Sequence, residues 1–124
     1  MRTILITGFG RFPGAAVNPS GTVAQMLARR RRPALAATRL IAHVFATSYE
    51  AVDRELPALL SHEKPDAIVL FGLASRARHV RVERMARNRV SVLFPDVRGA
   101  RPERRAIVPG GQPIRHTPLP IARI

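Results

Sequence analysis

The sequence predicts an α/β fold of the three-layer sandwich type, in which a mostly parallel, twisted sheet carries helices on both faces. Three short apolar runs, residues 2–7, 38–45 and 66–71, have the β-branched composition of buried strands. Between them lie two segments whose apolar residues recur at helical spacing. Strands that alternate with helices need crossover connections, which are right-handed and make the sheet parallel.

The first helix has clear boundary signals. Asn18 can cap its start, and Pro19 suits the first helical position, where a missing N–H costs nothing. The arginine run 29–32 is favourable at the negative end of the helix dipole, and Pro33 ends the helix. We therefore expect a helix over about residues 19–32.

The second helix is expected to begin near Thr47 or Ser48. Its apolar face contains Tyr49, Val52, Leu56, Leu59 and Leu60. Pro57 lies inside this pattern and is expected to kink the helix or split it in two, because proline cannot donate the internal hydrogen bond.

After Gly72 the pattern changes from helical spacing to alternation. Apolar residues at 80 and 82, and again at 90, 92 and 94, predict two short strands or a hairpin around residues 86–89. Beyond Pro95 the composition favours irregular surface loop. Residues 119–124 look like the first turn of another amphipathic helix, which could not support itself alone. We therefore expect residues 1–124 to form a single partial domain, truncated at the C-terminus.

Composition limits the classes of function. The net charge of +13 comes almost entirely from arginine and would attract nucleic acid without specificity. Apart from the run 29–32 the arginines are scattered, and aromatic residues make up only 5%, too few for a base-stacking platform. Binding of a specific nucleic acid is therefore the least favoured class.

Compartment and cofactors are also constrained. No apolar run approaches the roughly 20 residues that span a bilayer, and the N-terminus lacks the features of a signal peptide. We therefore expect a cytoplasmic protein without a membrane partner. There is no cysteine, which excludes disulfides and thiolate metal sites, and the four histidines show no metal-ligand spacing. No metal and no cofactor are expected.

Sites in parallel α/β sheets form at the carboxyl ends of strands. The loop after the first strand reads Gly8-Phe9-Gly10-Arg11-Phe12-Pro13-Gly14 and leads to Asn18-Pro19-Ser20, and the segment after the third contains Gly72-Leu73-Ala74 and Glu83-Arg84-Met85-Ala86-Arg87-Asn88. These motifs resemble the N-terminal portion of the pyroglutamyl-peptidase I (pyrrolidone-carboxylate peptidase) family. Further collinear matches are Lys64-Pro65-Asp66, Pro95-Asp96, Ile107-Val108-Pro109-Gly110 and Leu119-Pro120-Ile121.

The resemblance implies a cysteine omega-peptidase that removes pyroglutamate from the N-terminus of peptides. It implies that Phe9 and Phe12 hold the pyroglutamyl ring, and aromatic faces that exclude water suit a small neutral lactam. The alternative is that both phenylalanines pack beneath the sheet edge. For Asn18, positioning of backbone or substrate and simple helix capping remain equal alternatives.

The resemblance also assigns Glu83 as the third member of a Cys-His-Glu triad, where a carboxylate orients the imidazole that activates the thiol. Arginines around Glu83 should keep it ionised. The alternative is an ordinary ion pair with Arg81, Arg84 or Arg87.

Three departures from the family pattern affect this assignment. Ala77 stands where the family has an oxyanion-assisting arginine, although Arg76 and Arg78 flank it. Arg81 replaces a small hydroxyl residue. The family's cysteine and histidine fall beyond the position of Ile124. The chain is therefore expected to be inactive alone.

Other functions remain open as alternatives. The first is a pyroglutamate-binding remnant or pseudoenzyme, and the second is the basic nucleic-acid module. A partial sheet would also expose apolar edges, and a homo-oligomer is one way to cover them.

Overall fold

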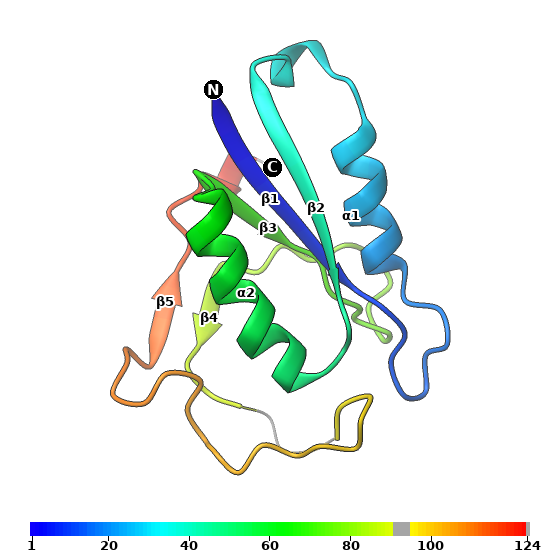
Figure 1. The fold of residues 1–124 in the computed structure, drawn as a ribbon, viewed down its shortest axis with the longest axis vertical. Coiled ribbons are helices and arrows are strands. Elements are labelled where there is room, and N and C mark those ends of the chain that lie inside the picture. Colours follow the sequence, from blue (N-terminus) through cyan, green and yellow to red (C-terminus); the bar gives the residue numbers. More distant parts are fainter. Residues whose placement is uncertain (91–94, 124) are drawn as a thin grey trace. The chain divides into compact units, whose positions relative to one another are not determined.

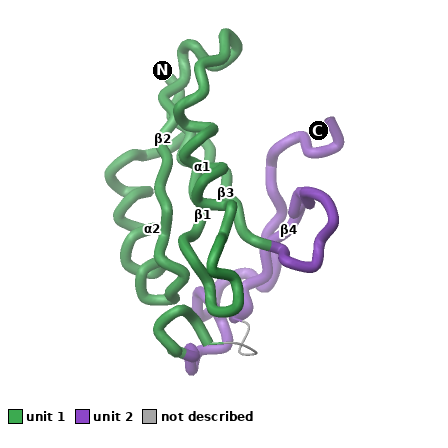
Figure 2. Tube along the Cα trace, turned by 90° about the vertical axis from the view of Figure 1, so that its right-hand side faces the viewer, with its two compact units in different colours: residues 1–73, 95–100 green, residues 74–94, 101–124 purple. Residues whose placement is uncertain are grey.

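The computed structural model describes residues 1–90 and 95–123 (Figure 1). The chain divides into two compact units (Figure 2). Unit 1 comprises Met1–Leu73 and Pro95–Ala100, and unit 2 comprises Ala74–Phe94 and Arg101–Ile124. That residues 1–124 act as a single domain stays a prediction.

Unit 1 contains the predicted alternation of strands and helices. Its elements in chain order are β1 (Arg2–Phe9), α1 (Pro19–Arg29), the 3₁₀ turn η1 (Pro33–Leu35), β2 (Thr38–Phe45), α2 (Tyr49–Glu63) and β3 (Ala67–Leu70). The strands form a parallel sheet in the order β2-β1-β3. The α/β class with a parallel sheet flanked by helices is therefore confirmed (Figure 1).

The two helices cover opposite faces of the sheet. Successive side chains of a strand point to opposite faces, and β2 shows this directly. A Cβ on Gly21 of α1 would lie 2.9 Å from the side chain of Val44. The neighbouring His43 instead pairs with Glu55 of α2. In the order β2-β1-β3, the crossover through α1 and the crossover through α2 run in opposite directions across the sheet. Because both crossovers are right-handed, their helices lie on opposite faces.

The close approach of β1 to α1 depends on glycine. A Cβ on Gly8 would collide with the backbone carbonyl of Ser20, and one on Gly21 would lie 2.8 Å from the carbonyl oxygen of Phe9. Neither position therefore has room for a side chain. Around this contact the fully buried side chains include Leu5, Ala24 and Phe45.

Helix α2 begins and ends at capped residues. The Ser48 side chain accepts a hydrogen bond from the Ala51 amide at 3.0 Å, which confirms the predicted start. The helix runs through Pro57 to Glu63, so the predicted split is wrong. Proline removes only one internal hydrogen bond, and the helix continues on both sides of it. Lys64 closes the helix in the left-handed conformation, with φ 44°.

Unit 2 differs from the sequence prediction. Its described strands, β4 (Met85–Arg87) and β5 (Ile114–His116), pair antiparallel. Residues 86 and 87 therefore belong to a strand rather than to the turn of a hairpin, and that prediction is wrong. Alternation of apolar residues does not show which strand a segment pairs with. Val80, part of the alternating pattern, is 86% exposed and lies in no strand. Of the other predicted half, Val90 lies in no strand, and residues 91–94 lie outside the described residues.

The remaining described part of unit 2 is largely irregular, as expected. Residues 101–113 contain no helix or strand, and Ile121–Arg123 form a single 3₁₀ turn, η2. Within residues 1–90 and 95–123, no helix has the length and apolar character needed to cross a membrane.

Candidate functional site

The loop that follows β1 carries the two candidate ring-binding residues. Phe9 is the last residue of β1, and its ring lies 5.8 Å from that of Phe45, measured between centroids. Phe12 and Ala15 bond each other's backbones across a tight turn, at 3.1 and 2.8 Å. Gly14 lies inside this turn with φ 84°, a conformation that favours glycine. Both phenylalanines are half-buried.

Asn18 caps α1. Its Oδ1 accepts hydrogen bonds from the Ser20 amide at 3.1 Å and from the Ser20 hydroxyl at 2.7 Å. The Ser20 hydroxyl oxygen in turn accepts a bond from the Phe9 amide at 2.9 Å. Of the two readings of Asn18, helix capping is therefore present. The same bonds tie the start of α1 to the end of β1, where Phe9 lies.

The other end of the loop is attached to the segment between β2 and α2. The Gly10 amide donates to the Phe45 carbonyl at 2.9 Å. The Thr47 hydroxyl lies 3.1 Å from the Gly10 carbonyl oxygen and 2.9 Å from that of Arg11. Because a hydroxyl has one proton, these two acceptors share it. Gly10 is thus held at both its amide and its carbonyl, and Arg11 at its carbonyl.

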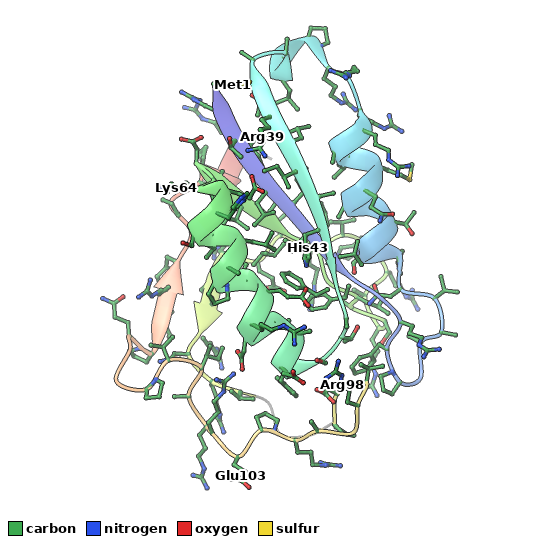
Figure 3. The ribbon with its side chains drawn as sticks, in the orientation of Figure 1. Met1, Arg39, His43, Lys64, Arg98 and Glu103 are labelled. Atoms are coloured by element: carbon green, nitrogen blue, oxygen red, sulfur yellow. The ribbon has the colours of Figure 1, made fainter. Side chains whose placement is uncertain are left out.

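Residues 95–100 hold the start of α2. The Asp96 carboxylate accepts hydrogen bonds from the amides of Tyr49 at 3.0 Å and of Arg98 and Ala100, both at 2.9 Å. Burial of Asp96 acts to raise its pKa, but these amides together outweigh burial and hold the pKa below its usual value. Arg98 also pairs with Glu50 beside the first turn of α2 (Figure 3).

Glu83 belongs to unit 2, two residues before β4. Its side chain is 73% exposed, and its Oε1 lies 3.5 Å from a guanidinium nitrogen of Arg81. The structure thus contains the ion pair that was the alternative to a catalytic role. A pair this exposed leaves the carboxylate free to exchange partners. Phe9, Phe12 and Asn18 belong to unit 1, and Glu83 belongs to unit 2.

The candidate oxyanion residues lie in a turn of unit 2. Ala77 is half-buried, and its amide donates to the Ala74 carbonyl at 2.9 Å. Arg76 and Arg78 on either side are exposed.

Asn88 has a structural role that the sequence did not reveal. Its side chain donates to the Val108 carbonyl and accepts from the Val108 amide, both at 2.7 Å. These two hydrogen bonds to the backbone of Val108 connect two of the matched motifs, Glu83 to Asn88 and Ile107 to Gly110. The match of both segments to family motifs is the one signal that could have drawn attention to this contact.

The histidines do not assemble a catalytic or metal centre in the described residues. His43 lies on β2 beneath α2, with Nε2 2.8 Å from Glu55 (Figure 3). His62 bonds its neighbour Glu63, while His79 and His116 are exposed. Within residues 1–90 and 95–123, no three His, Cys, Asp or Glu side chains gather as a metal site would require.

Solved peptidase structures share this architecture. The chain superimposes on the crystal structure of Bacillus amyloliquefaciens pyroglutamyl peptidase I with a TM-score of 0.84 and 28% identity, covering 99% of this chain and 58% of that one. A mutant pyrrolidone carboxyl peptidase from Pyrococcus furiosus gives a TM-score of 0.88 at 28% identity, covering 98% and 57%. At this identity and fit, the fold of the chain agrees with the corresponding part of these structures.

Sequence comparison gives the same result. The family described as pyroglutamyl peptidase matches residues 2–124, and the chain belongs to that family. The pyrrolidone-carboxylate peptidase of Thermococcus onnurineus is 34% identical over 121 residues, covering 98% of this chain and 58% of that protein. That of Chromobacterium violaceum is 33% identical over 124 residues, covering 100% and 58%. The chain thus spans less than two thirds of the length of these relatives.

Proposed function

We propose that this chain supplies the lactam-binding part of a pyroglutamyl peptidase, which removes N-terminal pyroglutamate from peptides, and that it has no peptidase activity alone. The observation that carries the proposal is the family match over residues 2–124, together with a Phe9 and Phe12 loop at the carboxyl edge of the parallel sheet. Sites form at this edge in open α/β sheets.

The chemistry explains why the chain alone is inactive. In a thiol peptidase the thiolate attacks the amide carbonyl, the amine leaves with a proton from the imidazole, and water then cleaves the acyl-enzyme. This chain contains no cysteine. Glu83 has the role of orienting an imidazole, so it cannot replace either the nucleophile or the base.

Activity gives the first test. The purified 124-residue chain is incubated with a chromogenic pyroglutamyl amide, and release of the amine is followed. We expect no turnover above that of a heat-denatured sample. Turnover that survives repeated purification and is lost in Glu83→Gln would contradict the inactivity of the chain.

Binding gives the second test. Isothermal titration of the chain with pyroglutamate should give heat that Phe12→Ala abolishes. Val17→Ala is the matched control, because Val17 lies in the same loop but is 82% exposed, so its truncation should leave binding unchanged. Absence of heat with the parent chain, or equal loss in both variants, would refute a lactam site in this loop.

A pseudoenzyme that binds pyroglutamate without cleaving it has the same loop chemistry. Glu83→Gln tests whether Glu83 takes part in binding. We expect this variant to leave pyroglutamate affinity unchanged, because the proposed partner of the carboxylate is the family's catalytic histidine, which falls beyond Ile124, rather than the lactam. A tenfold loss of affinity in that variant would instead assign Glu83 to ligand binding.

A further inference from the structure

We propose that Thr47 is a positioning residue of the Phe12 loop: its hydroxyl fixes residues 10 and 11, and residues 95–100 fix Thr47. The proposal deepens the proposed function, because it concerns how the lactam-binding loop is held. All the residues that carry it lie within unit 1.

The first step is the contact between Thr47 and the loop. The Thr47 hydroxyl is within hydrogen-bond distance of two consecutive carbonyl oxygens, those of Gly10 and Arg11, at 3.1 and 2.9 Å. These residues come directly before Phe12. Carbonyls in a loop rich in glycine and proline have no regular ladder to bond to, so a side-chain donor decides their direction.

The second step is that Thr47 is held in place by bonds outside the loop. Its own carbonyl accepts a hydrogen bond from the Val97 amide at 3.0 Å. Two residues later, the Tyr49 amide donates to Asp96, whose carboxylate also organises the turn 96–100. Thr47 is thus held between the start of α2 and a segment distant in sequence.

The third step connects this arrangement to Phe12. The Gly10 amide is bonded to the end of β2, and Phe12 is bonded to Ala15 across its turn. Between these two attachments, the Thr47 hydroxyl is the side-chain group that bonds the carbonyls of residues 10 and 11. Loss of the hydroxyl should free the carbonyls of residues 10 and 11, and the Phe12 ring should sample more orientations.

The experiment compares Thr47→Ser with Thr47→Ala, because serine and alanine differ by the hydroxyl alone. Thr22→Ser and Thr22→Ala form the matched control pair, since Thr22 is exposed on α1. Two quantities are measured on the 124-residue chain: amide hydrogen exchange of Phe12 and Ala15 by NMR, and the Kd for pyroglutamate. Thermal unfolding midpoints identify any variant whose change is only global destabilisation.

We expect Thr47→Ser to behave as the parent. In Thr47→Ala, the exchange rates of both amides and the Kd for pyroglutamate should each rise by about fivefold. This factor corresponds to the loss of one neutral hydrogen bond. The Thr22 pair should show no difference in either measurement. Asp96→Ala should act in the same direction as Thr47→Ala, because it releases the segment that holds Thr47.

Exchange rates that agree between Thr47→Ser and Thr47→Ala would overturn the proposal, whatever the affinity does. The same holds if the Thr22 pair changes as much as the Thr47 pair. If the parent chain binds no pyroglutamate, the proposed function fails, and the exchange measurement still decides whether Thr47 holds the loop.

Discussion

Thr7 is the buried polar side chain whose hydroxyl lacks a hydrogen-bond partner among the described residues. It lies in the middle of β1 and is 1% exposed. A buried hydroxyl without a partner loses its bonds to water and gains nothing in return. Its desolvation therefore reduces the stability of the parallel sheet.

Thr7→Val should stabilise the chain. Valine has nearly the same shape as threonine and no polar atom, so the free energy of unfolding should rise by about 1–2 kcal/mol. Chemical unfolding in urea measures this change. The control is Thr38→Val at the half-exposed start of β2, where the change should stay within a few tenths of a kcal/mol. A destabilised Thr7→Val chain would mean that the hydroxyl has a role in the fold.

Glu55 makes the stability of the chain depend on acid pH. The hydrogen bond from His43 lowers the pKa of Glu55, and burial opposes it more weakly. A carboxyl whose pKa is lower in the folded chain stabilises the fold above its unfolded pKa. That stability is lost as pH falls through the folded pKa.

We expect the free energy of unfolding to fall as pH drops below about 4.3, the ordinary pKa of glutamate. Glu63 and Asp96, whose pKa values are also lowered, add to the same fall. The difference between the parent and Glu55→Gln isolates Glu55, and it should shrink as pH decreases. Denaturant unfolding at several pH values measures it. A difference that is constant from pH 7 to pH 3 would contradict this.

At the scale of elements, the starts of α1 and α2 could be predicted because capping is local chemistry. Asn18 with Pro19, and Ser48 at the start of α2, act within one turn of the helix. The predicted end of α1 near residue 32 is wrong, because the helix ends at Arg29 and Arg30 already has an extended backbone. The outcome at Pro57 could not be predicted from the local pattern, because the residues on both sides of a proline decide whether the helix continues past it. The same limit explains β4, whose partner lies in the distant segment Ile114–His116.

The residue that ends α2, Lys64, has an unfavourable backbone conformation that a substitution could relieve. Lys64 has φ 44°, in the left-handed region, where a Cβ is unfavourable. Glycine is the usual residue at such a helix end. Lys64→Gly should therefore raise the free energy of unfolding by about 1 kcal/mol. Lys64→Ala is the control, since it removes the same charge but keeps the Cβ, and it should give no gain. Equal effects would assign the change to charge instead.

At the scale of the whole molecule, the sequence predicted the α/β class and the loop after β1, and it could not predict how the loop is held. Thr47 and Asp96 bond backbone groups far from them in sequence, so the sequence does not identify these partners, although Pro95-Asp96 is one of the family matches. Glu83 shows the same limit, because its position in the chain does not fix its position in space. The family resemblance supplied its assignment, and the structure supplied an ion pair with Arg81.

The outer edge of the sheet is the feature of unit 1 with the clearest consequence for association. In the order β2-β1-β3, β3 pairs with β1 on one side only among the described residues. Its apolar side chains Ile68, Val69 and Leu70 are exposed, Leu70 to 62%. Strands of parallel sheets are normally covered on both faces, and an uncovered apolar edge favours pairing with another chain.

We therefore expect the chain to self-associate with increasing concentration, and Leu70→Lys to reduce this. A lysine at an edge strand opposes pairing because its charge must be desolvated. Thr22→Lys adds the same charge on exposed α1, away from the edge, and should leave association nearly unchanged. Sedimentation velocity over a concentration series measures both variants. The parent's +13 charge already opposes association, so high salt should strengthen self-association of the parent and of Thr22→Lys alike. Equal reductions in both variants would show that net charge, rather than the β3 edge, controls it.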